Sequence, residues 1–213
     1  MLMKKVGEIK NRLLGLHSSP EDVVVTLGKW FEGGGKKGAY DFFRPRGVPK
    51  LWARVVWSSF ITPKHCFIMW LAIRGRLNTF DRLGFVDDLD PMCRLCNERE
   101  ESVTHLFFAC CVTSGIWREI REWLGIRRDM STLRSALKWM KKEARGTGWR
   151  KKAMKMALAT TVYVIWEARN KLVYEGVNPI PRNIVSSIKT SVYRIIFHLY
   201  PSLLESLESG HLG

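Results

Sequence analysis

The sequence predicts a mostly α-helical protein, with a small knuckle module and a helical carboxyl-terminal half. Two observations predict this class. Apolar residues recur at helical spacing through several long segments, whereas the alternation that is typical of strands is weak throughout. About 46% of the 213 residues are hydrophobic. That content suffices for one core or two small ones and is too high for a mainly disordered chain.

The first elements are expected to be short. Residues 1–37 are predicted to be irregular, because a run of three glycines beside two lysines is loop material. Residues 51–60 indicate a short helix or strand, and Pro63 then breaks the chain. From residue 65 to 77 the apolar spacing predicts a mostly buried helix. Thr79 is a candidate cap for a further short helix.

Longer helices are expected in the second half. Residues 105–124 carry apolar side chains on one side of a predicted helix, and residues 133–145 predict a basic amphipathic helix that glycines end. Residues 149–174 predict a long helix with an apolar middle, and residues 183–200 a last one.

The net charge of +15 is concentrated in one part of the chain. Residues 118–155 hold 13 Lys or Arg and four acids, whereas residues 87–105 carry a net charge of −4. Because Lys and Arg release counterions from a phosphate backbone, this clustering favours nucleic acid as a partner; the alternative is a solvated basic helix face. The residues expected to meet phosphates are Arg127, Arg128, Lys138, Lys141, Lys142, Arg150, Lys151 and Lys152.

The strongest local motif is Cys93-x2-Cys96-x8-His105-x4-Cys110. Two Cys at this spacing can bind one metal ion from a tight turn, and the His and the last Cys can complete the set. Three thiolates and one imidazole are the ligands of a closed structural zinc site, which keeps no open position for a substrate. The spacing alone leaves free thiols and redox chemistry open, and Cys111 is a rival fourth ligand.

Other features bear on the class of function. No apolar run of about 18 residues appears, so no membrane partner is expected. The sequence shows neither paired carboxylates suited to a nuclease nor a polymerase turn, so we expect no enzyme activity and no small-molecule substrate.

The nine Trp are expected mainly in the core, with base stacking as the alternative, and Cys66 is expected to be a buried thiol. Two basic clusters resemble a two-part nuclear localisation signal. We therefore expect an intracellular location, with the nucleus as a candidate compartment.

An ordered series of motifs runs from about Ala39 to Leu124. It includes Phe67-Ile68-Met69-Trp70-Leu71-Ala72, Cys93-Arg94-Leu95-Cys96, Glu101-Ser102 and His105-Leu106-Phe107-Phe108. In these residues the chain resembles the reverse transcriptase zinc-binding domain of plant non-LTR (LINE-type) retrotransposon polyproteins. Ile165-Trp166-Glu167-Ala168-Arg169-Asn170 resembles the segment that follows this domain and leads into a ribonuclease H domain.

The resemblance implies a division into three parts: an amino-terminal segment 1–37, the zinc-binding domain 38–125, and a basic helical region 126–213 that precedes a missing ribonuclease H domain. It also implies a structural Zn²⁺ ion, and Cys111 falls one residue beyond the family's last Cys. The implied function is a non-catalytic accessory module that binds RNA or DNA, or other domains of the polyprotein. The alternatives are a protein-interaction module and a non-functional relic. The ligands implied for the zinc are Cys93, Cys96, His105 and Cys110.

Overall fold

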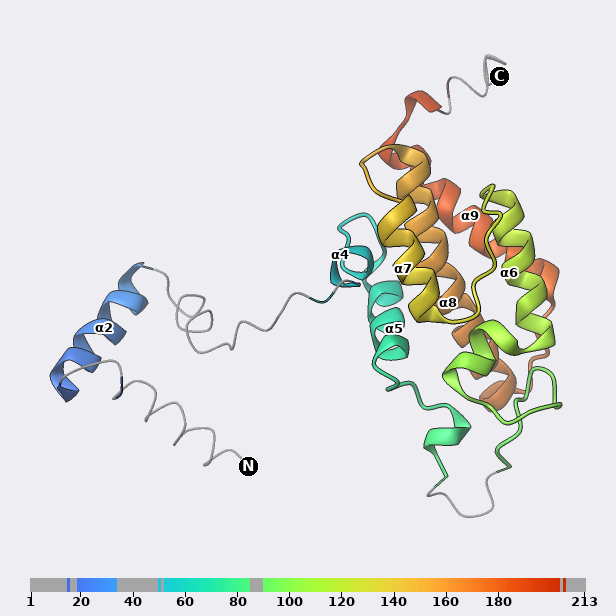
Figure 1. The fold of residues 1–213 in the computed structure, drawn as a ribbon, viewed down its shortest axis with the longest axis horizontal. Coiled ribbons are helices and arrows are strands. Elements are labelled where there is room, and N and C mark those ends of the chain that lie inside the picture. Colours follow the sequence, from blue (N-terminus) through green and yellow to red (C-terminus); the bar gives the residue numbers. More distant parts are fainter. Residues whose placement is uncertain are drawn as a thin grey trace. The chain divides into compact units, whose positions relative to one another are not determined.

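The computed structural model describes residues 15, 19–33, 50, 52–84, 90–203 and 205. It divides into two compact units, residues 1–49 and 50–213. The chain is mostly helical, which confirms the predicted class (Figure 1). Within the described residues the only β-type pairing is an isolated antiparallel bridge between Met92 and Glu100.

The first unit contains helix α2 (Pro20–Gly33). This part of the chain was predicted to be irregular, and for these residues the prediction was wrong. Ser19 begins the helix, because its Oγ accepts a hydrogen bond of 3.2 Å from the backbone N–H of Asp22. The acids in the first turn also interact favourably with the positive end of the helix dipole. Most of the remaining predicted irregular segment lies outside the described residues.

The second unit is built from short helices followed by longer ones. Its elements in chain order are α4 (Ala53–Val56), α5 (Pro63–Ile73), the 3₁₀ turn η1 (Phe80–Arg82), the π-helical turn η2 (His105–Ala109), α6 (Cys111–Trp123), α7 (Leu133–Glu143), α8 (Trp149–Glu175) and α9 (Pro181–Leu199).

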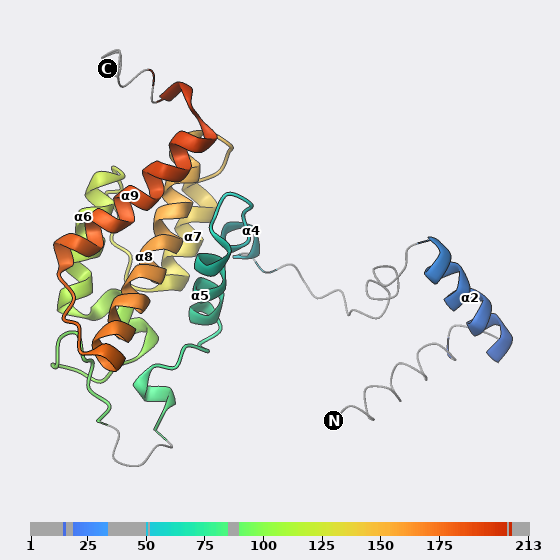
Figure 2. The ribbon, with the colours of Figure 1, turned by 180° about the vertical axis from the view of Figure 1, so that it is seen from behind.

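Helix α8 is the centre of this unit. Its residues 156–162 are all buried, so its middle is covered on every side, as expected of a helix that is apolar all round. It packs against α9 and α5 and also contacts α4 and α6. Figures 1 and 2 show α9 on one side of α8 and α7 on the other.

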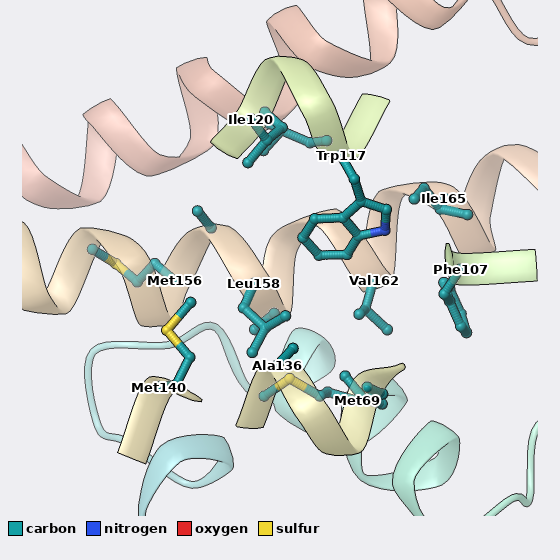
Figure 3. Close-up of a cluster of buried hydrophobic side chains, with 14 of the residues drawn as sticks. Met69, Phe107, Trp117, Ile120, Ala136, Met140, Met156, Leu158, Val162 and Ile165 are labelled. Carbon is teal, nitrogen blue, oxygen red and sulfur yellow. The ribbon is translucent and has the colours of Figure 1, made fainter. Parts of the chain in front are cut away.

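One core joins the parts that the sequence analysis separated at residue 125. Figure 3 shows Trp117 and Ile120 of α6 approaching α8 from one side, while Met69 of α5 and Met140 of α7 approach from the other. The predicted boundary between the zinc-binding domain and the basic helical region is therefore not a boundary between compact units. The physical reason is that short helices need a partner for their apolar faces, and α8 supplies it.

Among the described helices, none combines the length and the apolar character that crossing a bilayer requires.

Candidate metal centre

The four predicted ligand residues come together in the structure. Cys93, Cys96, His105 and Cys110 each offer one ligand atom, and these atoms all lie within 4.8 Å of one another. The Sγ atom of Cys96 lies 3.3 Å from Nε2 of His105. Sulfur and nitrogen ligands of a tetrahedral zinc ion lie about 3.6 Å apart, given their usual bond lengths. The donor set and its spacing therefore fit one Zn²⁺ ion.

The first two Cys lie on a tight turn that backbone hydrogen bonds close. The N–H of Cys93 donates to the carbonyl of Arg99 over 2.8 Å, and the N–H of Asn97 donates to the carbonyl of Cys93 over 2.7 Å. Asn97 has a φ of 54°, in the left-handed region that Asn tolerates better than most residues. The bridge between Met92 and Glu100 holds the two sides of this turn together.

The other two ligands lie at either end of a π-helical turn. The N–H of Cys110 donates to the carbonyl of His105 over 2.8 Å, which is a bond between residues five apart. In an α-helix, residues five apart point about 140° away from each other, and the wider π turn reduces this divergence. The Oγ1 of Thr113 donates to the carbonyl of Leu106 over 2.8 Å and so ties the turn to α6.

The prediction of one continuous helix over residues 105–124 was therefore wrong at Cys110. Its backbone is extended, with φ −67° and ψ 133°, and α6 begins at the next residue. The break is what allows the fourth thiol to face the same point as the imidazole.

Burial and hydrogen bonding shift the pKa values of the donor groups in different directions. Cys93 and Cys110 are fully buried, His105 is 7% exposed, and Cys96 is half-buried. A hydrogen bond from Cys110 to the sulfur of Cys93 lowers the pKa of Cys93 and raises the pKa of Cys110. Burial lowers the pKa of His105, which favours the neutral imidazole that binds metals. The site is thus largely closed to water.

Cys111, the rival fourth ligand, lies on the outer side. It is exposed, and its sulfur forms a second group with the ligand atoms of Cys96 and Glu98, again within 4.8 Å. It shares only one member with the buried group. Because Cys111 is exposed whereas Cys110 is buried with the other donors, Cys110 is the better candidate for the fourth ligand.

A buried ion pair next to the site was missed by the sequence analysis. Glu101 and Arg169 have no exposed side-chain surface, and Nη2 of Arg169 lies 2.6 Å from Oε1 of Glu101. Nε of Arg169 donates to Oε2 over 3.0 Å, so the pair is bidentate. The backbone N–H of Phe80 donates to Oε1 over 3.0 Å, and the guanidinium lies 4.3 Å from the centre of the Phe80 ring.

This pair connects the knuckle to the central helix. Glu101 lies between the two halves of the Cys/His motif, and Arg169 belongs to α8. Both residues stand in motifs that the sequence analysis quoted, but without a role. One signal was available: Arg169 follows Ile165 by one helical turn, so it lies on the apolar side of a helix that is otherwise filled with buried residues.

A family comparison supports the same assignment. Residues 36–117 match the family described as zinc-binding in reverse transcriptase. This zinc-binding segment includes all four residues of the buried cluster. Over these residues the chain is similar to the zinc-binding segment of reverse transcriptases. The zinc-binding family and the Cys/His cluster together confirm the prediction of a structural Zn²⁺ cofactor. Neither the curated proteins nor the solved structures give a match to the chain.

The predicted phosphate contacts divide into two groups. Lys151 and Lys152 are only half-exposed: Nζ of Lys151 donates to the carbonyl of Glu143 over 2.6 Å, and Nζ of Lys152 lies over the rings of Tyr200 and Phe60. These two cations are thus engaged by the chain itself. The other six are exposed: Arg127, Arg128, Lys138, Lys141, Lys142 and Arg150.

Helix α7 orders part of this charge into a row. Its apolar side is buried, and its other side and the residue after its cap are exposed and cationic. Two of these cations were not among the residues predicted to meet phosphates. We name this row the cation stripe; its members are Arg134, Lys138, Lys141, Lys142 and Arg145.

Proposed function

We propose that the chain is a non-catalytic, zinc-stabilised accessory module of a LINE-type retrotransposon reverse transcriptase that binds the backbone of RNA or DNA. The observation that carries the binding role is the cation stripe. Four exposed cations lie on one side of α7 and a fifth, Arg145, follows its cap, while the opposite side of the helix is fixed in the core.

In this proposal Cys93, Cys96, His105 and Cys110 hold the zinc ion. Three of the four donors are buried, and four protein ligands complete a tetrahedral shell. The ion supplies a cross-link between the knuckle turn and the π-helical turn. These residues thereby stabilise the fold, and no step of chemistry is assigned to them.

The ligand assignment can be tested with two neighbouring cysteines. Cys110→Ser removes a buried donor, whereas Cys111→Ser removes an exposed thiol one residue away and serves as the matched control. We expect about one zinc per chain in the wild type and in the control, and well below half of that in Cys110→Ser, by elemental analysis of purified protein. Full zinc retention in Cys110→Ser, or equal loss in both variants, contradicts the assignment.

Binding through the cation stripe is expected to be led by phosphates. Lys and Arg side chains on a solvent-facing helix can reach a polyanionic backbone without reading bases. Such binding weakens as salt rises, because the counterions released on binding return to the nucleic acid. The affinity for one probe measured over a salt series therefore reports how many phosphate contacts are made.

A charge-matched pair of variants tests the location. Lys138→Gln/Lys141→Gln/Lys142→Gln removes three cations of the stripe. Lys171→Gln/Arg182→Gln/Arg194→Gln removes three exposed cations from α8 and α9. It therefore has the same net charge as the stripe variant. The plot of log affinity against log salt has a negative slope. The stripe variant should reduce the magnitude of that slope by about two, and the control should reduce it much less.

An equal effect of both variants would show that only the total charge matters. An affinity of the wild type that does not change with salt would overturn the nucleic-acid role and leave the protein-interaction module.

A further inference from the structure

We propose that an aromatic platform on α4 and α5 stacks the unpaired bases of single-stranded nucleic acid. The platform consists of Trp57, Phe67 and Trp70. The inference rests on the proposed function for the class of partner, but it uses a different surface and makes a narrower claim, namely that single strands are preferred to duplexes.

The rings of the platform contact one another and face water. The ring centres of Trp57 and Trp70 lie 6.5 Å apart, and those of Phe67 and Trp70 lie 5.8 Å apart. Trp57 is 52% exposed and Phe67 is 50% exposed, while Trp70 is half-buried. Phe67 and Trp70 are three residues apart on α5 and thus lie on neighbouring positions of one helix face. Trp57 directly follows α4.

The charge around the platform selects a polyanion as its occupant. Residues 50–80 contain five Lys or Arg and no Asp or Glu. Arg54, Lys64 and Arg74 are exposed on the same two elements or at their ends. Nζ of Lys64 lies 4.5 Å from the centre of the Tyr163 ring of α8, so this cation, like Lys152, is engaged by a ring of the chain, and Arg54 and Arg74 are the cations offered to phosphates. An exposed aromatic patch for a basic or neutral protein partner would not need this one-sided charge.

Exposed rings and cations together are the combination that binds single strands. Every base has a π face that can stack on an aromatic side chain, and cations beside the rings meet the phosphates between successive bases. In a duplex the base faces are already stacked on one another, so the rings have nothing to bind. The cation stripe can meet the phosphates of either form, whereas the platform distinguishes between them.

The test compares two probes on the full chain, an oligo(dT) single strand and a DNA duplex of equal length. Trp57→Leu/Phe67→Leu keeps apolar side chains but removes two π faces. Tyr174→Leu is the matched control, because Tyr174 is 72% exposed and lies on the last turn of α8. The double variant should weaken oligo(dT) binding by about 100-fold, from roughly tenfold for each ring. Its duplex affinity and its zinc content should stay within twofold of the wild type, and the control should change neither affinity.

A spectroscopic signal tests the same contact directly. A stacked base quenches the fluorescence of the indole that it covers. The emission that wild type has and Trp57→Phe lacks should therefore be quenched by oligo(dT) and not by the duplex. Because Trp57→Phe keeps a π face, it should retain most of the oligo(dT) affinity.

Three outcomes overturn the proposal: equal weakening of both probes by the leucine variant, unquenched Trp57 emission in the presence of bound oligo(dT), or a leucine variant that only converts a dimer into a monomer in sedimentation. The proposed function fails separately. If the variant of the cation stripe binds both probes as the wild type does, the phosphate site is elsewhere, while the platform is still judged by its own variants. If the wild type binds neither probe, both proposals fall.

Discussion

At the scale of single residues, the contact between Glu101 and Arg169 has the largest predicted effect on stability. The two residues are 68 positions apart in the chain, and neither side chain is exposed. Each buried charge is tolerated because the other faces it with two hydrogen bonds. Removal of one partner leaves the other charge buried without compensation.

Glu101→Gln should therefore lower the free energy of unfolding by about 3–5 kcal/mol. Asp90→Asn is the control, because Asp90 pairs with Arg94 over 2.9 Å at the surface and such pairs contribute about 1 kcal/mol or less. Urea denaturation of both variants beside wild type, all loaded with zinc, measures the difference. Similar small losses for the two variants would show that the buried pair is not a major source of stability.

His65 is a buried histidine whose protonation opposes folding. Its Nδ1 lies 3.2 Å from Oγ1 of Thr160, and its ring stacks on Tyr163. Burial, with the charge of Lys64, lowers the pKa of His65 from 6.5 to about 4. In the unfolded chain the imidazole keeps its ordinary pKa, so between these two pH values the unfolded chain binds more protons than the folded one.

The contribution of His65 is thus fully present above pH 6.5 and is lost as the pH falls towards 4. We expect a loss of about 2 kcal/mol across this window, after allowance for screening by solvent. His65→Gln should flatten the curve of unfolding free energy against pH relative to wild type. Both proteins keep the Cys/His cluster, so acid release of zinc affects both curves alike, and curves of equal slope would contradict the assignment.

The sequence was sufficient to find the four residues of the cluster, because their spacing along the chain is itself the signal. It was not sufficient to pair Glu101 with Arg169. The helical spacing places Arg169 on the apolar side of α8, but it does not name the partner, because the contact with Glu101 depends on how α8 packs against the knuckle. Long-range pairing of this kind follows from tertiary packing, which local patterns do not specify.

At the scale of elements, the start of α7 shows how a local signal fixes a helix. The N–H of Ser135 donates to Oγ1 of Thr132 over 3.1 Å, and the N–H of Thr132 donates to Oγ of Ser135 over 3.2 Å. This reciprocal capping box satisfies two donors that the helix leaves free. The cation stripe begins within this box, at Arg134.

Thr132→Ala should destabilise the protein by about 1 kcal/mol, the usual effect of losing an N-cap side chain. Ser131→Ala changes the exposed residue just before it and should have an effect below about 0.5 kcal/mol, as for most surface substitutions. Thermal unfolding followed by circular dichroism compares the two. An undiminished transition temperature in Thr132→Ala would mean that packing of the apolar side alone determines where α7 begins.

The helices after residue 125 begin close to where the sequence predicts. The predicted starts of α7 and α8 agree with the structure, and that of α9 lies within two residues, because several turns of apolar spacing outweigh a single misleading residue. The break at Cys110 could not be read from that spacing, since both sides of it carry apolar residues. Helix α2 was missed because the run of glycines from Gly33 led to the prediction that all of residues 1–37 are irregular. The helix lies before that run and ends at its first glycine.

At the scale of the whole molecule, the second unit has one core that spans the zinc-binding segment and the helices after it. Buried residues from Val55 of α4 to Ile196 of α9 form one cluster. The family match ends at residue 117, before α7, α8 and α9. Within this unit, the part that is similar to a known family is therefore smaller than the compact unit itself.

A chain that ends after residue 125 should consequently fail to fold cooperatively, even with zinc. It lacks α8, which covers the buried sides of α5 and α6, and it lacks Arg169. We expect no sigmoidal thermal transition in circular dichroism and strong binding of a hydrophobic dye, whereas the full chain shows the opposite. A cooperative transition in the shortened chain would contradict the single core.

The buried pair also determines which relatives can exchange parts with this chain. A knuckle taken from a relative brings its own residue to the position of Glu101, where it meets the guanidinium of Arg169. An acidic residue there neutralises the charge of Arg169, whereas a neutral residue leaves that charge buried without a partner. Chimaeras with an acidic residue at position 101 should therefore fold, and those with a neutral residue there should be destabilised. Changes at positions 101 and 169 are expected to be inherited together.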